Sequence, residues 1–364
     1  MFAFRDTKQI QIEITQKCQA QCPMCPRNIH GGIDNPSLNL KDWSLQDFIE
    51  IFNEEVLSQI DLIIFCGNFG DPVLNNDLLG MCEYVKNQNK DVEISIHSNA
   101  GLRNRDWWRR LASVLPKKHT VYFAIDGLQY TNHLYRRNTD YNKIIDNAKA
   151  FIGAKGRAVW MFIKFAHNQH QVEDAKKVSE KLGFADFKQK ESKRFGTAFP
   201  VVDKHGKFLY NIKQPDDSNI QKVDYDSVAN YKSWPKATEI NCFADNDKEL
   251  YIDVEFRLMP CCMIGSFLFA NYDVALYKKY NLNDKVLEIG KKVQDEIFSL
   301  IEEFGGDHAL NVKKHSIQKV MNTDSWQKLL KYKWKNKQSP ACIILCSADS
   351  PYIQNEDQWV TGKK

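Results

Sequence analysis

Three cysteines near the start of the chain have the spacing of a loop that binds a metal or a cluster. Cys18, Cys22 and Cys25 follow the pattern C-x3-C-x2-C, with no fourth cysteine nearby. A closed structural zinc site uses four ligands. A 4Fe–4S cluster on three thiolates instead leaves one iron open to an outside ligand. The spacing therefore favours a catalytic cluster over a zinc loop completed by a distant residue or over incidental thiols.

A second group of cysteines lies late in the chain. The chain has ten cysteines and no apolar signal segment at its N-terminus, so metal or redox chemistry explains them better than a disulfide framework. Cys66 and Cys82 are isolated and fit simple packing. The distance between the two groups suggests two metal sites. The late group consists of Cys242, Cys261, Cys262, Cys342 and Cys346.

The elements that position the first group alternate between strand and helix. Short β-rich runs occur at 9–15, 62–67, 91–98, 120–127, 158–166 and 186–194, with helical patterns between them. This alternation predicts βαβ units with a parallel strand layer. Six strands are too few for an eight-stranded barrel, so we expect an α/β fold that forms a partial (β/α)6 barrel. Functional residues then belong just after the carboxyl ends of the strands.

Polar or glycine-rich peptides follow the second, third and fourth expected strands. The second is followed by Gly67, Asn68, Phe69, Gly70 and Asp71. Glycines there let the backbone approach a ligand closely, and a carboxylate accepts hydrogen bonds from an ammonium group. The third and fourth are followed by Ser98, Asn99, Asp126, Arg136 and Arg137.

The cysteine loop and these peptides together resemble the radical S-adenosylmethionine (radical SAM) enzymes. In that family the three cysteines hold a 4Fe–4S cluster whose free iron binds SAM. The chain departs from the family pattern at Met24, usually aromatic, at Asp71, usually Glu, and at Ala124, usually Ser. The resemblance assigns SAM contacts to Gly67, Asn68, Gly70, Asp71, Ser98, Asn99, Asp126 and Arg137, with Arg137 preferred over Arg136.

The late cysteines resemble the auxiliary-cluster domain, of SPASM or twitch type, that some radical SAM enzymes carry. The resemblance implies a second 4Fe–4S cluster, and a structural zinc on the same four thiolates is the alternative. We prefer Cys261 over Cys262 because it follows a proline, as at the usual exit of the hairpin. The implied ligands are Cys242, Cys261, Cys342 and Cys346.

The expected domain organisation follows from these resemblances. Residues 1–200 form the partial barrel, 201–240 a polar connector, 241–350 the small C-terminal auxiliary-cluster (twitch-like) domain, and 351–364 a tail. A helix at 283–304 is inserted in the auxiliary domain, where it packs on the barrel or covers the site as a lid. Because the chain begins almost at its first strand, we expect no separate leader-binding domain before it.

The resemblance implies an oxidoreductase that cleaves SAM reductively to a 5′-deoxyadenosyl radical, which then abstracts a hydrogen atom from the substrate. The expected substrate is a peptide or protein, with a sugar- or cyclitol-like small molecule as the alternative. A flavodoxin- or ferredoxin-type protein is the expected reductant. A non-catalytic zinc-binding interaction protein is the alternative from another class.

Composition restricts the partners. The formal net charge of +4 argues against a nucleic-acid partner. No apolar run is long enough to span a membrane, and we expect a cytoplasmic protein.

Overall fold

The computed structural model of the chain describes residues 2–192, 198–218, 227–228, 230–233, 235, 239–279, 285–328, 339–348 and 350. The chain divides into two compact units. One is Ile12–Ile220, and the other combines Met1–Gln11 with Gln221–Lys364. The expected tail, 351–364, lies outside the described residues.

The unit Ile12–Ile220 alternates strands and helices along the chain. Its strands are β2 (Asn28–Ile29), β3 (Ile33–Asp34), β4 (Leu62–Phe65), β5 (Glu93–Ser98), β6 (Thr120–Ala124), β7 (Ala158–Lys164), β8 (Asp186–Glu191), β9 (Phe199–Val202) and β10 (Phe208–Ile212). Its helices are α1 (Leu45–Ile51), α2 (Glu54–Gln59), η2 (Pro72–Leu74), α3 (Leu78–Gln88), α4 (Arg105–Val114), α5 (Asn132–Tyr135), α6 (Tyr141–Gly153), η3 (Gln169–Gln171) and α7 (Val172–Leu182).

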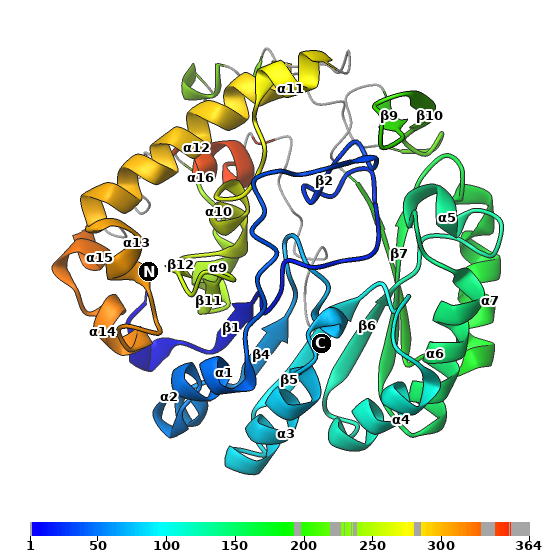
Figure 1. Cartoon of the computed structure of the whole chain (residues 1–364), viewed down its shortest axis with the longest axis horizontal. Helices are drawn as coiled ribbons and strands as arrows, with labels where there is room; N and C mark the ends of the chain where they lie inside the picture. Colours follow the sequence, from blue (N-terminus) through cyan, green and yellow to red (C-terminus); the bar gives the residue numbers. More distant parts are fainter. Residues whose placement is uncertain are drawn as a thin grey trace. The chain divides into compact units, whose positions relative to one another are not determined.

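Strands β4, β5, β6, β7 and β8 lie side by side in chain order, and every neighbouring pair is parallel. Right-handed crossovers between successive neighbours place all the connecting helices on the same face of a sheet. Figure 1 shows α3, α4, α6 and α7 along one side of these strands. The other face of the sheet is therefore left without a helix layer from these crossovers, as in a barrel.

Local sequence sets where these helices begin and end. Ser44 accepts a hydrogen bond from the Asp47 backbone and forms a capping box at the start of α1. Asp140 caps α6, because its carboxylate accepts from the backbone N–H groups of Asn142 and Lys143. Helix α7 ends at Leu182 because Gly183 adopts a left-handed φ of 85°. The caps leave few orphan backbone groups at these helix ends.

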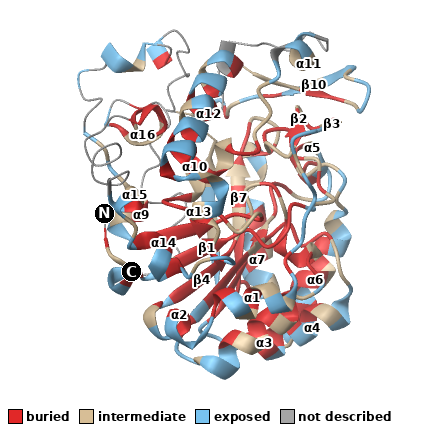
Figure 2. Cartoon of the chain, turned by 60° about the vertical axis from the view of Figure 1, so that its left-hand side comes forward, coloured by how far each residue is buried: buried red, intermediate tan, exposed pale blue. Residues whose placement is uncertain are grey.

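The core of this unit lies between the sheet and the helices. All four residues of β4 are buried, and α4 turns Trp108 and Leu111 inward. Figure 2 shows the buried residues in red on β4 and on the inner sides of α3, α4 and α6. Apolar burial on this face therefore holds the strands, and their carboxyl ends, in fixed positions.

The second unit contains a small antiparallel strand layer and mainly helices. Its elements are η1 (Phe4–Asp6), β1 (Gln9–Ile12), η4 (Tyr231–Ser233), α9 (Phe243–Asn246), β11 (Glu249–Ile252), β12 (Leu258–Met259), α10 (Cys262–Phe267), α11 (Val274–Lys279), α12 (Lys285–Phe304), α13 (Gly306–Leu310), α14 (Ile317–Met321), α15 (Asp324–Lys328) and α16 (Pro340–Cys346). The last residue of β1, Ile12, belongs to the first unit. β12 pairs antiparallel with β11, next to β1.

The predicted α/β class and the partial-barrel strand order are confirmed. All six expected strand regions contain a strand, namely β1 and β4 to β8. The sequence missed one element. Part of the expected connector 201–240 belongs to the hairpin β9–β10, which packs into the unit Ile12–Ile220. Its pattern of alternating apolar residues is short, so a connector was the simpler interpretation.

Candidate functional site

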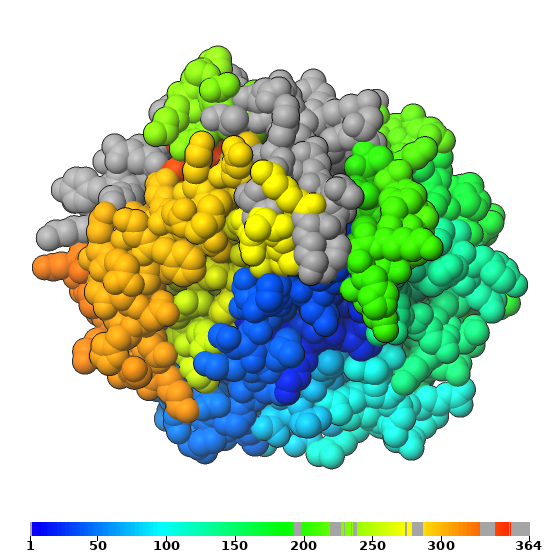
Figure 3. Space-filling view, turned by 45° about the horizontal axis from the view of Figure 1, so that its top comes forward, coloured from blue at the N-terminus to red at the C-terminus, as the bar shows by residue number. Residues whose placement is uncertain are grey.

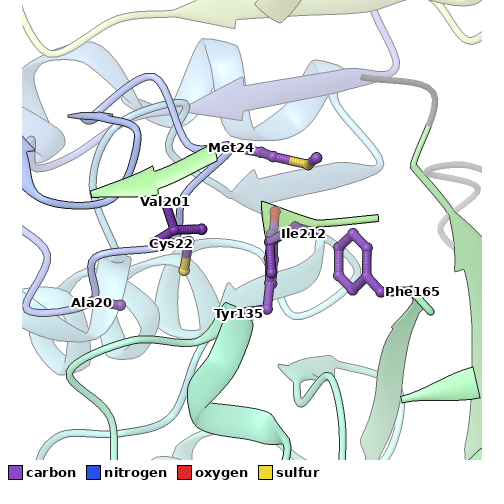
Figure 4. Close-up of a cluster of buried hydrophobic side chains, with 7 residues drawn as sticks. All are labelled: Ala20, Cys22, Met24, Tyr135, Phe165, Val201 and Ile212. Atoms are coloured by element: carbon purple, nitrogen blue, oxygen red, sulfur yellow. The ribbon is translucent and has the colours of Figure 1, made fainter. Parts of the chain in front are cut away.

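The loop that carries the first three cysteines lies in a tight, partly buried turn. Cys22 is buried, while Cys18 and Cys25 are half-buried. The backbone N–H of Cys25 donates to the carbonyl of Cys22 at 3.1 Å. Figure 4 shows Cys22 and Met24 on this loop, facing residues from other parts of the unit. The loop is therefore held by tertiary packing as well as by its own turn.

Two of the three sulfurs receive N–H groups from side chains that are distant in sequence. Nδ2 of Asn99, just after β5, donates to Sγ of Cys18 at 3.5 Å. Nη1 of Arg136, which ends α5, donates to Sγ of Cys22 at 3.6 Å. N–H groups directed at sulfur stabilise negative charge on it. The surroundings are therefore suited to thiolates that bind a cluster.

Burial favours the protonated form of Cys18 and Cys22. Burial raises the pKa of Cys18 well above its usual value, and the nearby Asp71 raises it further. Burial raises the pKa of Cys22 to about 11, although Arg136 opposes the shift. Within the described part of the chain, no three His, Cys, Asp or Glu side chains already surround a common metal position.

A buried ion pair fixes the arginine that reaches Cys22. Nε of Arg136 donates to Oδ2 of Asp126 at 2.6 Å, and Asp126 is fully buried. Oδ1 of Asp126 also accepts from the Ile163 backbone at 2.5 Å. Burial alone lowers the pKa of Arg136, but Asp126 and Cys22 together raise it above its ordinary value. The guanidinium thus stays charged beside the sulfur.

The predicted SAM contacts Asp71, Ser98 and Asn99 lie together. Oδ2 of Asp71 accepts from the Asn99 backbone at 2.8 Å, from Asn99 Nδ2 at 2.5 Å and from Ser98 Oγ at 3.1 Å. Burial raises the pKa of Asp71 despite these hydrogen bonds. Asn99 also accepts from Gln19, on the cysteine loop, at 2.6 Å. These residues therefore connect two strand ends to the cysteine loop.

The loop at residues 67–70 is held by Glu13, a residue that the sequence analysis missed. Oε1 of Glu13 accepts from the backbone N–H groups of Phe69 at 2.7 Å and Gly70 at 2.9 Å. A Cβ on Gly70 would lie 1.8 Å from the Thr15 carbonyl, and one on Gly67 would lie 2.9 Å from Glu13. The loop, which also carries half-buried Asn68, is therefore pressed against residues 13–16.

Arg137 points to the hairpin β9–β10 instead of the sulfurs. Its Nη1 donates to the carbonyls of Gly31 at 2.9 Å and Val202 at 2.7 Å. The Val202 N–H donates to the His30 carbonyl at 3.1 Å. Figure 3 shows the green hairpin exposed on the surface. Arg137 therefore ties the cysteine loop to the hairpin.

The hairpin also supplies part of the apolar packing around Cys22. Buried Val201 and Ile212 share a cluster with Ala20, Cys22 and Met24, which Figure 4 shows. Tyr135 and Phe165 complete this cluster, with rings 4.6 Å apart. A short alternation of apolar residues at 199–202 and 208–212 is the signal that could have revealed the hairpin.

The late cysteines are brought together in the second unit. The Asn241 N–H donates to the Cys346 carbonyl at 2.9 Å, so the segment before Cys242 lies against the end of α16. Cys342 and Cys346 are four residues apart and share a face of that helix. Cys261 is buried at the start of α10, with Cys262 next to it.

The pKa shifts of these thiols show that they influence one another. Burial raises the pKa of Cys261, and Cys262, Cys242 and Cys342 raise it further. Burial raises the pKa of Cys346 to about 12, with a further contribution from Cys242. Four thiols with no carboxylate among the predicted ligands form a donor set that fits an iron–sulfur cluster.

No helix among the described residues is long and apolar enough to cross a membrane. Models of known protein families and curated protein sequences give no match to this chain.

Comparison with solved structures finds several similar folds at low identity. SuiB of Streptococcus suis bound to S-adenosylmethionine has 14% identity and a TM-score of 0.47. The match covers 71% of this chain but 61% of SuiB, so this chain spans less than two thirds of SuiB.

Two further structures match over most of both chains. Native anSMEcpe with bound AdoMet has 13% identity over 93% of this chain and 88% of its own, with a TM-score of 0.49. BtrN in complex with AdoMet and 2-DOIA has 10% identity over 93% of this chain and 92% of its own, with a TM-score of 0.43. AdoMet is S-adenosylmethionine, so the three structures described here all contain that molecule.

Proposed function

We propose that this chain is a radical SAM enzyme whose first cluster is held by Cys18, Cys22 and Cys25. One observation supports this most strongly. Side chains from the ends of two different strand–helix units, Asn99 and Arg136, direct N–H groups at the sulfurs of Cys18 and Cys22. A loop of incidental thiols has no need of such donors.

When bound, a 4Fe–4S cluster supplies a one-electron reductant and an open iron at this loop. The chain's own residues hold the loop in place. Arg136 neutralises charge beside Cys22, and Asp126 keeps Arg136 in position. The apolar cluster of Val201, Ile212 and their neighbours limits access of water to Cys22.

The SAM contacts are proposed from the resemblance and from the neighbourhood of the loop. Asp71, with the backbone at Gly67, Asn68 and Gly70, would receive the amino group of SAM. Ser98 and Asn99 would contact its ribose and carboxylate. Asp126 would act mainly through Arg136. The resemblance assigns the SAM carboxylate to Arg137, although its Nη1 donates to the carbonyls of Gly31 and Val202. Hydrogen bonds from Asn99 and Ser98 already hold Asp71 close to the cysteine loop.

The proposed reaction is reductive cleavage of SAM to a 5′-deoxyadenosyl radical, which abstracts a hydrogen atom from a peptide or protein substrate. A second cluster on Cys242, Cys261, Cys342 and Cys346 would accept an electron from the substrate radical, which makes the net reaction an oxidation. The proximity of these four thiols supports the second site. A flavodoxin- or ferredoxin-type reductant would supply the electron for SAM cleavage, and a small-molecule dehydrogenase is the alternative activity.

The test is anaerobic reconstitution with iron and sulfide, followed by addition of SAM and dithionite. The proposal predicts 5′-deoxyadenosine by mass spectrometry from the wild-type protein and from Cys82→Ala, whose thiol is buried on α3. Cys22→Ala should form none while it retains the second cluster. A colourless protein that contains zinc and no iron would disprove the proposal in favour of a zinc-binding protein.

A further inference from the structure

Arg27 reaches back across the cysteine loop to the point where the loop begins. Its Nε donates to the carbonyl of Cys18, nine residues earlier, at 3.1 Å. Its Nη1 donates to the carbonyl of Gln16, eleven residues earlier. We call these two hydrogen bonds the Arg27 clamp. The segment that the clamp encloses carries Cys18, Cys22 and Cys25, so one side chain closes the three-cysteine loop into a ring.

The guanidinium group is suited to this contact. Its N–H groups form a rigid, planar fork, so two acceptors that are bound by different nitrogens are held at a fixed separation. Here the two acceptors are backbone carbonyls at the start of the loop. Arg27 therefore fixes the path of the backbone from which the side chain of Cys18 projects.

Both segments that the clamp joins are held by further contacts. Buried Asn35 donates through Nδ2 to the Pro26 carbonyl at 2.9 Å, and its backbone N–H donates to the Arg27 carbonyl at 3.1 Å. At the other end, Oε1 of buried Gln16 accepts from the Asn39 N–H at 3.0 Å. Because both anchors are held from outside the loop, the clamp sets the separation between them.

The charge of Arg27 is not balanced in the way that the charge of Arg136 is. Arg136 is paired with the buried carboxylate of Asp126. Among the residues that the structure describes, Arg27 forms no ion pair with a carboxylate, and its acceptors are carbonyls. Thiolates that hold a cluster carry negative charge, which a nearby cation stabilises. The clamp therefore supplies a cation as well as a fixed backbone path.

We propose that Arg27 is a positioning residue that holds the cysteine loop in the form that binds the cluster, and so slows loss of the cluster. It acts through the backbone carbonyls of Gln16 and Cys18. This inference rests on the proposed function, because it takes the cluster to be bound by Cys18, Cys22 and Cys25. An arginine that only stabilised the fold would not change how long the loop keeps a cluster.

The test is the rate at which the reconstituted full-length protein loses its first cluster to EDTA under anaerobic conditions. Samples are taken over time, reduced with dithionite and frozen for electron paramagnetic resonance (EPR). The signal of the first cluster is the one that Cys22→Ala lacks. Arg27→Gln removes the charge and the fork. Its signal should decay at least about tenfold faster than that of wild type, as for other residues that support metal ligands.

Arg103→Gln is the matched control. Nε of Arg103 donates to the Val73 carbonyl at 2.8 Å, and its Nη2 donates to the carbonyls of Leu74 and Asn75 at 3.1 Å each. The same kind of contact is lost there, but on a loop without cysteines, so the signal should decay at the wild-type rate. Arg27→Lys keeps the charge without the rigid fork, and its decay rate should lie between those of wild type and Arg27→Gln.

Faster decay in both Arg27 variants, with Arg103→Gln unchanged, supports the inference. The inference fails if Arg27→Gln keeps its signal as long as wild type, or if Arg103→Gln loses the signal equally fast. Equal decay of Arg27→Lys and wild type also overturns it, because charge alone would then be sufficient. If circular dichroism shows that Arg27→Gln is unfolded, the comparison of Arg27→Lys with wild type decides.

The measurement also separates this inference from the proposed function. If wild type forms 5′-deoxyadenosine but Arg27→Gln keeps its cluster as long as wild type, the clamp alone is disproved. If the clamp slows cluster loss but wild type never forms 5′-deoxyadenosine, the radical SAM proposal alone is disproved. An EPR spectrum of Cys22→Ala identical to that of wild type would show that the loop holds no cluster, and both would then fail.

Discussion

Arg136 donates a 2.6 Å hydrogen bond to the fully buried carboxylate of Asp126 and, through another nitrogen, reaches the sulfur of Cys22. Asp126, ten residues earlier in the sequence, thus holds the guanidinium. The guanidinium contacts Cys22, which is more than a hundred residues away in the sequence. The pair joins the end of strand β6 to the cysteine loop. Its energetic contribution can be measured directly.

Removing this arginine should destabilise the protein strongly. Arg136→Met leaves Asp126 buried without its cation, and breaking a buried pair in this way costs about 3–5 kcal/mol. The matched control is Arg105→Met, which breaks an exposed 2.9 Å pair with Asp146 and should cost less than about 1 kcal/mol. Urea unfolding measures the loss of unfolding free energy in both variants. Equal losses in the two variants would contradict the structural role of the buried pair.

Glu13 should hold the loop at residues 67–70 through its carboxylate. Glu13→Ala removes the acceptor of the Phe69 and Gly70 N–H groups and should cost about 1–3 kcal/mol for each donor left unsatisfied. Glu13→Gln keeps an oxygen acceptor and should cost less. The measurement is the free energy of unfolding of the two variants. An Ala variant as stable as the Gln variant would show that the Glu13 side chain does not hold the loop.

Gly70 should tolerate no side chain. In Gly70→Ala the new Cβ meets the Thr15 carbonyl at 1.8 Å, so the backbone must move. Gly153→Ala is the control, because nothing lies within 4 Å of its Cβ position at the end of α6. We expect a lower melting temperature for the first variant, and for the second no change or a gain of about 0.5–1 kcal/mol. Similar behaviour of the two would show that the close approach at Gly70 is absent in solution.

Glu249 should make stability depend on pH. Burial raises its pKa from 4.5 to about 8, with a smaller contribution from Asp247. The folded state therefore holds this proton where the unfolded state has lost it. The stability that depends on protonated Glu249 is fully present below about pH 4.5. It is lost as the pH rises to about 8, and the free energy of unfolding then falls by up to about 1.4 kcal/mol per pH unit.

The variant Glu249→Gln isolates this contribution from other titrating groups. The difference in unfolding free energy between variant and wild type should grow in favour of Gln from pH 5 to pH 8. Measurement by urea unfolding at several pH values tests it. A difference that is constant over this range would show that Glu249 titrates normally.

Cys261 and Cys262 should respond differently to substitution. Cys261 is buried, and both Cys242 and Cys342 raise its pKa. Cys261→Ala should therefore lose the second cluster, seen as a lower iron content, while Cys262→Ala should keep it. Loss of iron in Cys262→Ala alone would assign the ligand to that residue instead. Unchanged iron in both variants would argue against a second cluster at this position.

Local patterns in the sequence were sufficient for the strand–helix order and for the two groups of cysteines. Short β-rich runs predicted the strands β4 to β8, because the residue preferences and periods of strands depend on residues close in sequence. The spacing of Cys18, Cys22 and Cys25 is likewise local.

Only the tertiary structure decided which distant residues meet these local features. Glu13 under Gly70, Arg136 beside Cys22, and the hairpin β9–β10 against the cysteine loop join segments 50 or more residues apart. Such contacts depend on how buried surfaces fit together, and no short-range period in the sequence encodes that fit.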